Sequence, residues 1–219
     1  MLVTIYTALL DFLFPPHCPV CGAYSDKVGA WCPACLQKTI CCHRLPLRAG
    51  AYPFLQRVQA AGHYRGGMKK LIQQLKYHKN LGAVKYIDVF LEAASQQLLV
   101  SRPDYVVPVP LYREKQKSRG FNQAEKIFRP WAEKKGYVWF DALARTKPTR
   151  PQYDLSPCER QQNMKNAFVV KEPIVWKNKN ILLVDDIFTT GATLESCAAA
   201  LKKSGAARIE GLVLASDSQ

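Results

Sequence analysis

One segment constrains the fold more than any other part of the chain. Residues 181–193 run Ile-Leu-Leu-Val-Asp-Asp-Ile-Phe-Thr-Thr-Gly-Ala-Thr. The continuous apolar run at 181–184 is typical of a central parallel strand that is buried on both faces. The residues from Thr193 to Ser204 predict a helix that Gly205 ends. This segment therefore predicts a strand, a polar loop and a helix in direct succession.

Other stretches of the chain alternate in the same way. We predict helices over 68–77, 83–99 and 121–135, strands over 105–108 and 208–215, and a linker over 45–53. Strands alternating with helices indicate an α/β fold whose central, mostly parallel sheet is flanked by helices. We assign residues 51–219 to this domain and residues 1–50 to a small N-terminal module.

The loop before the last helix suits a phosphate group. A helix N-terminus offers unpaired backbone N–H groups and the positive end of the helix dipole. Gly191 and Ala192 let the backbone approach a ligand closely, and three hydroxyls can donate to phosphate oxygens, those of Thr189, Thr190 and Thr193. A plain helix cap at Thr193 is the alternative.

Two adjacent carboxylates, Asp185 and Asp186, precede this loop. They would repel a phosphate, but they match the vicinal hydroxyls of a ribose, which donate hydrogen bonds. Binding of Mg²⁺ alone is the alternative. Together with the loop they predict a 5-phosphorylated ribose site at the carboxyl end of the sheet.

Six of the eight cysteines crowd into residues 18–42. Four of them form two C-x-x-C pairs, Cys18 with Cys21 and Cys32 with Cys35. Two such pairs can surround one structural Zn²⁺ tetrahedrally. The alternative is two disulfides in a secreted protein. Cys41, Cys42 and His43 are left over, and we assign them no second zinc.

The first 17 residues are apolar, but they lack a basic start, contain Asp11 and precede no small-residue cleavage site. We therefore expect no secretion signal. The run is also shorter than the roughly 20 residues of a membrane span. Leu2, Ile5, Leu9 and Phe12 predict an amphipathic helix that leads into the cysteine-rich module.

The net charge is +14, from 31 basic and 17 acidic side chains. The excess is greatest in residues 101–150, which carry 12 basic and 5 acidic residues. A bias of this size predicts a polyanionic partner, whereas the alternative is a solvated basic surface.

Residues 181–193 resemble the 5-phosphoribosyl 1-pyrophosphate (PRPP) motif of the type I phosphoribosyltransferases. That resemblance implies that Asp185 and Asp186 hold the ribose and that residues 189–193 hold the 5-phosphate. It also implies a pyrophosphate loop after the strand at 105–108, Mg²⁺ bound with PRPP, and a mobile basic loop. Arg113 and Lys115 are the expected pyrophosphate contacts, and a carboxylate of the Asp pair is the candidate general base.

A closer resemblance extends over residues 10–216. The cysteine pairs, Gln74-Leu75-Lys76-Tyr77, Val107-Pro108-Val109-Pro110-Leu111, Arg119-Gly120-Phe121-Asn122-Gln123-Ala124, and Gln152 with Arg160 and Asn163 are similar to the ComF family, its ComFC and GntX-like members included. Many relatives carry a double zinc ribbon, whereas this chain has only Cys41-Cys42 where a second set of knuckles is expected.

The ComF resemblance implies a role in natural transformation, in the cytoplasm or at the inner face of the membrane. The implied partners are single-stranded DNA, contacted by Lys115, Lys117 and Arg119, and a competence helicase. Two classes of function stay open. One is a phosphoribosyltransferase with an unknown acceptor, and the other is a binding protein on a PRPP-binding fold without turnover.

Overall fold

The computed structural model describes residues 15–25, 27, 29–47, 50–146, 167–171 and 176–217. The helix predicted near the N-terminus lies outside these residues, as do Gln152, Cys158, Arg160 and Asn163. The elements, in chain order, are α2 (Pro33–Thr39), β1 (Ile40–Arg44), β2 (Arg57–His63), α3 (Gly66–Tyr77), α4 (Gly82–Ala94), β3 (Tyr105–Pro108), α5 (Arg113–Arg119), α6 (Gln123–Lys134), β4 (Val138–Trp139), β5 (Leu143–Arg145), β6 (Phe168–Val170), β7 (Asn180–Phe188), α8 (Ala192–Lys203) and β8 (Arg208–Ser216).

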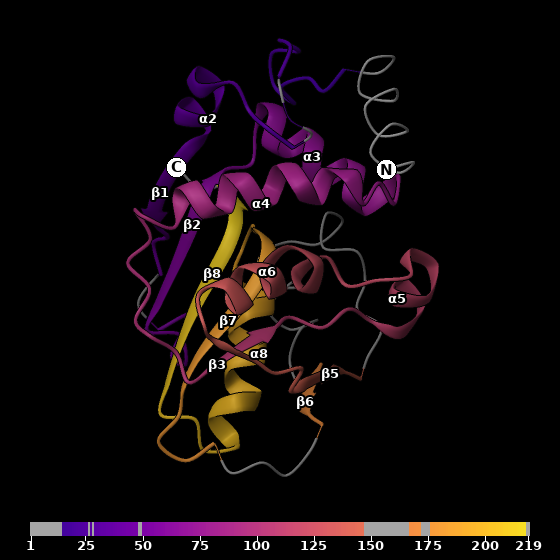
Figure 1. The fold of residues 1–219 in the computed structure, drawn as a ribbon. Helices are drawn as coiled ribbons and strands as arrows, with labels where there is room; N and C mark the ends of the chain where they lie inside the picture. The colour runs from indigo at the N-terminus through magenta and orange to yellow at the C-terminus, as the bar shows by residue number, and fades with distance from the viewer. Residues whose placement is uncertain are drawn as a thin grey trace.

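A six-stranded sheet organises the described chain, with the strand order β1-β2-β8-β7-β3-β4 (Figure 1). All neighbours in it are parallel except β1 and β2, which are antiparallel. The mostly parallel α/β sheet predicted from the sequence is confirmed. The strands β5 and β6 form a separate antiparallel pair.

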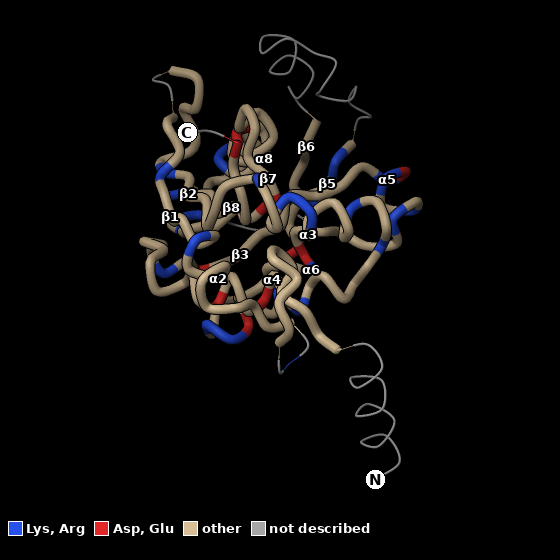
Figure 2. Tube along the Cα trace, turned by 90° about the horizontal axis from the view of Figure 1, so that it is seen from above, with Lys and Arg blue, Asp and Glu red and all other residues tan. Residues whose placement is uncertain are grey.

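Helices cover both faces of the sheet (Figure 2). Apolar residues of α8, such as Leu194, Cys197 and Leu201, pack with Leu183 and Val213 in one core cluster. The opposite cluster contains residues of α3, α4 and α6. Because β7 and β8 lie between the two clusters, they are buried on both faces, as their continuous apolar runs predict.

Several boundaries differ from those predicted. The strand expected at 181–184 continues to Phe188, because Asp185, Ile187 and Phe188 still pair with β8. The helix expected to reach Leu99 ends at Ala94. The strand β2 was not predicted, because its Ala- and Gly-rich centre, Gln59-Ala60-Ala61-Gly62, lacks the β-branched residues typical of strands.

None of the helices in the described ranges has the length and apolar character needed to cross a membrane.

Candidate functional site

The carboxyl ends of β3 and β7 meet where the strand order changes direction. From β3 the chain crosses to β4 on one side, whereas from β7 it crosses to β8 on the other. The two strands stay paired to their ends, and the backbone N–H of Val109 donates to the carbonyl of Val184 at 2.9 Å. In open α/β sheets, ligands bind in the crevice at such a switch point.

Asp185 and Asp186 stand at this position on β7, and alternation along a strand sends their side chains to opposite faces of the sheet. Asp186 is 7% exposed and forms an ion pair with Lys76 of α3, 2.9 Å from Nζ to Oδ2. Asp185 lies within electrostatic range of Arg145, at the end of β5 on the α8 side. The pair thus lies between cations contributed by distant parts of the chain.

The electrostatics of the crevice follow from burial and from this close pairing of charges. Burial, reinforced by the neighbouring Asp186 charge, raises the pKa of Asp185 from 3.8 to about 7. Burial lowers the pKa of Lys76, but the attraction of Asp186 outweighs it and the pKa is raised. Burial also lowers the pKa of the Arg145 guanidinium. The site therefore contains the carboxyl group of Asp185, which titrates near neutrality, close to the positively charged ammonium of Lys76.

The Thr/Gly loop closes the crevice at the N-terminus of α8. Gly191 has φ +72°, and a Cβ there would lie 2.7 Å from the rings of both Phe188 and Tyr52. The Tyr52 hydroxyl donates to the carbonyl of Thr190 at 2.5 Å. Tyr52 belongs to the linker predicted over 45–53, so this segment holds the Thr/Gly loop in place. The Thr190 Oγ1 is buried and has no hydrogen-bond partner in the described part of the chain. A phosphate oxygen would give this hydroxyl the acceptor it lacks.

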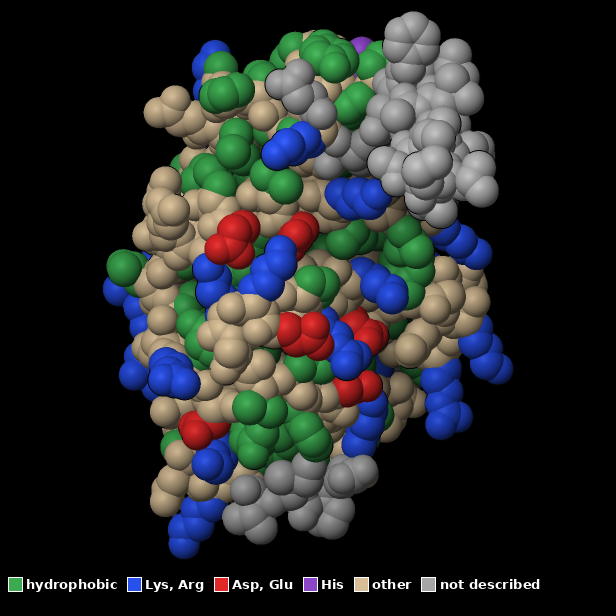
Figure 3. Space-filling view, in the orientation of Figure 1, with side chains coloured by type: hydrophobic (Ala, Val, Ile, Leu, Met, Phe, Trp, Pro, Cys, Tyr) green, Lys and Arg blue, Asp and Glu red, His purple; other side chains and the backbone are tan. Residues whose placement is uncertain are grey.

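The basic segment after β3 is the short helix α5 rather than the mobile loop expected. Tyr112 precedes it in an extended conformation, and Gly120, with φ +86°, ends it. Figures 1 and 2 show α5 projecting from the side of the sheet, and on the face in Figure 3 basic side chains gather along that side.

One side of α5 is directed toward the crevice. Burial lowers the pKa of Lys115, and the positive charges of Arg145, Arg119 and Lys76 lower it further. Lys115 and Arg119 lie four residues apart and share a face of α5, while Arg113 and Lys117 share another. Lys115 therefore lies within electrostatic range of Arg119 and of the two cations beside the Asp pair, Lys76 and Arg145. Arg119 is half-buried, whereas Lys115 is exposed, as Arg113 and Lys117 are.

The string Arg119-Gly120-Phe121-Asn122-Gln123-Ala124 positions the loop after β3. Asn122 is 8% exposed, caps α6 by accepting from the Ala124 N–H at 3.0 Å, and donates to the carbonyl of Val109 at 2.9 Å. The buried Nε2 of Gln123 has no partner in the described residues. Asn122 therefore ties the start of α6 to Val109, directly after β3, beside the crevice.

Two groups of this site, Lys76 and Arg145, were not assigned to it from the sequence. Lys76 belongs to the Gln74–Tyr77 string that resembles the ComF family, and this string was the one available signal. Arg145 lies in no motif, and only the placement of β5 brings it near Asp185.

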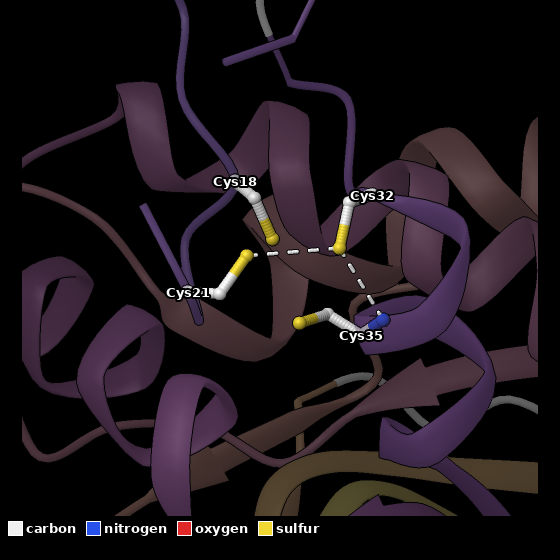
Figure 4. A group of neighbouring side chains, drawn as sticks. All are labelled: Cys18, Cys21, Cys32 and Cys35. Carbon is white, nitrogen blue, oxygen red and sulfur yellow. Dashed lines mark hydrogen bonds between the residues drawn. The ribbon is translucent and has the colours of Figure 1, made fainter. Parts of the chain in front are cut away.

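The four cysteines of the C-x-x-C pairs converge as predicted (Figure 4). Their sulfur atoms lie within 4.8 Å of one another, and Cys21 Sγ is 3.7 Å from Cys32 Sγ. The Cys35 N–H donates to Cys32 Sγ at 3.4 Å. Burial opposes ionisation of Cys18, but backbone N–H groups, Cys21 first, overcome it and lower its pKa to about 6. Four thiolates so arranged fit a closed, structural zinc site.

The cysteine module rests on α3 and α4. Val20, between Cys18 and Cys21, lies so close to Gly67 of α3 that a Cβ on Gly67 would meet it at 2.4 Å. Trp31 donates from Nε1 to the carbonyl of Tyr86 at 2.8 Å, and its ring packs against Phe90. The module therefore buttresses the two helices that cover one face of the sheet.

A groove of about 370 Å³ lies away from this site, beside the first residues of β2 and β8. Arg57 and Arg208 line it, but both pair with Glu210, at 2.8 and 2.6 Å. Glu210 offsets only one of these two positive charges, and Arg44 also lines the groove, so the groove stays basic. It lacks the paired carboxylates and the helix N-terminus that the crevice at β7 offers to a phosphorylated ribose.

Comparison with known proteins matches both parts of the chain. A model of the phosphoribosyl transferase domain matches residues 133–219, and one of the double zinc ribbon domain matches residues 9–51. DNA utilization protein YhgH of Escherichia coli K12 is 30% identical over 198 residues, 88% of this chain and 81% of that protein. Competence protein F of Haemophilus influenzae is 30% identical over 89% of this chain and 82% of its own. Competence protein ComFC of Bacillus subtilis is 27% identical over 90% and 83%.

Among solved structures, adenine phosphoribosyltransferase of Leishmania tarentolae is 16% identical, with a TM-score of 0.37 over 64% of this chain and 73% of that chain. The type I phosphoribosyltransferase fold is given by the domain match together with the strand order. The ribbon match and the four-cysteine cluster support a structural zinc.

Proposed function

This chain belongs to the ComF family, and from that premise we propose that it binds PRPP with Mg²⁺ in the crevice between β3 and β7 and holds single-stranded DNA along α5. The relatives named for competence and for DNA utilization support a role in DNA uptake. We further propose that it acts on the cytoplasmic side of the membrane and works with a competence helicase.

The observation that carries the proposal is the convergence at the carboxyl end of β7. Asp185 and Asp186, the loop 189–193 and four basic groups come from separate segments and meet at one switch point. The four cations are Lys76, Lys115, Arg119 and Arg145. Carboxylates for a ribose, a helix N-terminus for a phosphate and cations for a pyrophosphate are the three elements that PRPP requires.

Each group has a definite task in this proposal. Thr190 Oγ1 and the N–H groups at the start of α8 hold the 5-phosphate. Asp185 and Asp186 accept hydrogen bonds from the ribose hydroxyls, and Lys76 orients Asp186 through its ion pair. Lys115 and Arg119 approach the pyrophosphate from α5. Arg113, the other contact expected from the sequence, lies on a different face of this helix, so we assign it to the DNA instead.

The carboxylates also fit Mg²⁺, which prefers oxygen ligands and takes one or two carboxylates together with phosphate oxygens. Asp185 and Asp186 would hold the ion with the substrate. When bound, it would supply positive charge to the departing pyrophosphate.

Calorimetric titration of the zinc-loaded chain with PRPP and Mg²⁺ tests the proposal. We expect binding by the wild type and loss of it in Asp185→Ala/Asp186→Ala. The matched control is Asp88→Ala/Glu92→Ala, which removes two carboxylates from α4 that pair with Lys134 and Lys135 on the surface. Absence of binding by the wild type would overturn the PRPP site.

Both classes of function bind PRPP, so release of pyrophosphate is the measurement that separates them. A transferase releases pyrophosphate when its acceptor is present, and Asp185→Asn must then lower turnover or PRPP affinity. A binding protein without turnover holds PRPP and DNA and releases no pyrophosphate. The basic excess of residues 101–150 favours DNA binding in either case, and its affinity should fall steeply with salt.

A further inference from the structure

A second cluster of ligand-type side chains lies outside both sites described above. Cys41 and His43 belong to β1, and His63 is the last residue of β2. One ligand atom of each lies within 4.8 Å of the others, and the two imidazole rings stack with centroids 4.8 Å apart. We propose that Cys41, His43 and His63 form a second zinc site, distinct from the four-cysteine centre.

An irregularity in β1 brings the three side chains together. Ile40 pairs with Gly62 and His43 pairs with Ala60, so β1 carries one extra residue opposite β2 at this point. Such a bulge redirects the side chains beside it. Gly62 allows the strands to approach, since a Cβ there would lie 2.9 Å from the carbonyl of Thr39.

Cys42 is separated from this cluster. Its thiol donates to the carbonyls of Ala61 at 3.7 Å and Ala94 at 3.5 Å, and it packs against the core beneath α4. The two adjacent cysteines therefore have different surroundings. Only Cys41 has its sulfur near the histidines.

The hydrogen bonding of His43 leaves one nitrogen available. Its Nδ1 lies 2.7 Å from the carbonyl oxygen of Cys41, so Nδ1 carries the proton and Nε2 keeps its lone pair. That Nε2 is buried and has no hydrogen-bond partner in the described residues. A ring whose far N–H donates to a backbone carbonyl is the usual form of a metal-binding histidine. A metal ion would give the buried lone pair the partner that it lacks.

The donor set limits the metal to a transition ion that accepts both thiolate and imidazole ligands, and among these we propose zinc. One thiolate with two imidazoles suits zinc, and tetrahedral coordination at 2.0–2.3 Å would place the ligand atoms about 3.5 Å apart. The side chains would have to draw together by about 1 Å, through rotation about their own bonds. Three protein ligands leave a fourth position for water or another ligand. The site differs from a second ribbon, because His63 lies outside the matched residues 9–51.

Position in the fold indicates what the metal would do. The strand β1 follows directly from the cysteine module through α2, while β2 is the first parallel strand of the main sheet. A bound metal would therefore link the cysteine module to the first parallel strand of the main sheet. His63 pairs with Ser216, which pairs with Phe188 of β7. The proposed metal site therefore lies at the same end of the strands as Asp185. Two strand spacings, about 10 Å, separate β2 from β7.

Metal analysis of the purified full chain tests this inference with zinc as the probe. After zinc loading and removal of excess, we expect two zinc equivalents in the wild type. Cys41→Ser, His43→Asn and His63→Asn should each retain one. Cys42→Ala and the surface variant His78→Ala should retain two, and Cys32→Ser should lose only the zinc of the four-cysteine centre. One equivalent in the wild type, or two in Cys41→Ser and His63→Asn, would overturn the proposal.

Cobalt substitution of the wild type keeps the test decisive if a variant fails to fold. The second cobalt equivalent should add a thiolate-to-metal charge-transfer band about one quarter as strong as that of the first, because it has one sulfur ligand instead of four. Binding of a second cobalt equivalent without such a band would be adventitious, and it would overturn the assignment of Cys41 as a ligand.

Discussion

Lys76 Nζ lies 2.9 Å from Asp186 Oδ2 and joins the last turn of α3 to the carboxyl end of β7. The two side chains are 18% and 10% exposed, so the pair is largely desolvated. Asp185 is the next residue along β7, and the charge of Lys76 opposes the repulsion between it and Asp186. The ion pair therefore offsets part of the cost of burying two adjacent acids.

Replacement of Lys76 should destabilise the protein markedly. Removal of one partner from a buried pair leaves an uncompensated charge, so Lys76→Met should cost about 3 kcal/mol at pH 8. Lys70→Met, on the exposed side of the same helix, should change little. Urea unfolding of both variants provides the measurement. Equal stability of the two variants would contradict a role for the ion pair.

Asp185 should make stability fall as the pH rises. Its pKa in the folded chain is about 7, against an ordinary value of 3.8, so the folded state binds the proton more tightly than the unfolded state. The proton therefore stabilises the fold below pH 7, and this contribution is lost as the pH rises through about 7.

Unfolding of the PRPP-free protein at pH 6 and pH 8 measures this effect. Asp185→Asn cannot ionise, so its stability relative to the wild type should rise by about 1 kcal/mol between these pH values. Glu195 also titrates in this range, because burial raises its pKa to about 6. Since both proteins contain Glu195, the difference between them isolates Asp185. A pH-independent difference would refute the raised pKa.

Gly191 should not tolerate a side chain. Alanine there would adopt φ +72° and would place its Cβ 2.7 Å from two aromatic rings. Gly136→Ala is the matched control, because φ is +68° but no atom lies within 4 Å of the added Cβ. We expect a cost of about 1 kcal/mol for the control and about 3 kcal/mol for Gly191→Ala, together with loss of PRPP binding. Similar losses of stability in both variants would contradict a steric clash of the added Cβ with Tyr52 and Phe188.

Local patterns were sufficient to predict the parts of the site that are continuous in sequence. The apolar run before Asp185, the loop to Thr193 and the two C-x-x-C pairs each contain their own signal. The strand and helix on either side of the loop form as predicted, and the four cysteines converge as predicted at a separate place. Lys76 and Arg145 could not be found this way, because they reach Asp185 and Asp186 only through the packing of α3 and β5. The conformation of α5 was missed because its sequence of charges has no apolar periodicity.

Variants on the two sides of α5 distinguish the proposed PRPP site from the proposed DNA site. Lys115→Gln/Arg119→Gln and Arg113→Gln/Lys117→Gln each remove two positive charges from the same helix, so their long-range electrostatic effects match. Lys115 lies within electrostatic range of Arg119 and of the crevice cations Lys76 and Arg145. Loss of charged contacts to pyrophosphate should therefore weaken PRPP binding about tenfold or more in the first variant, and little in the second.

DNA binding should respond differently. A single strand held along α5 is bound mainly through its phosphates, and each contact removed should lower the salt slope by about 1. Lys115→Gln/Arg119→Gln and Arg113→Gln/Lys117→Gln should therefore both weaken DNA affinity and flatten its salt dependence, measured by fluorescence anisotropy with a labelled oligonucleotide. Equal loss of PRPP affinity in both variants would contradict the assignment of Lys115 and Arg119 to the crevice. Unchanged DNA affinity in both would remove α5 from the DNA path.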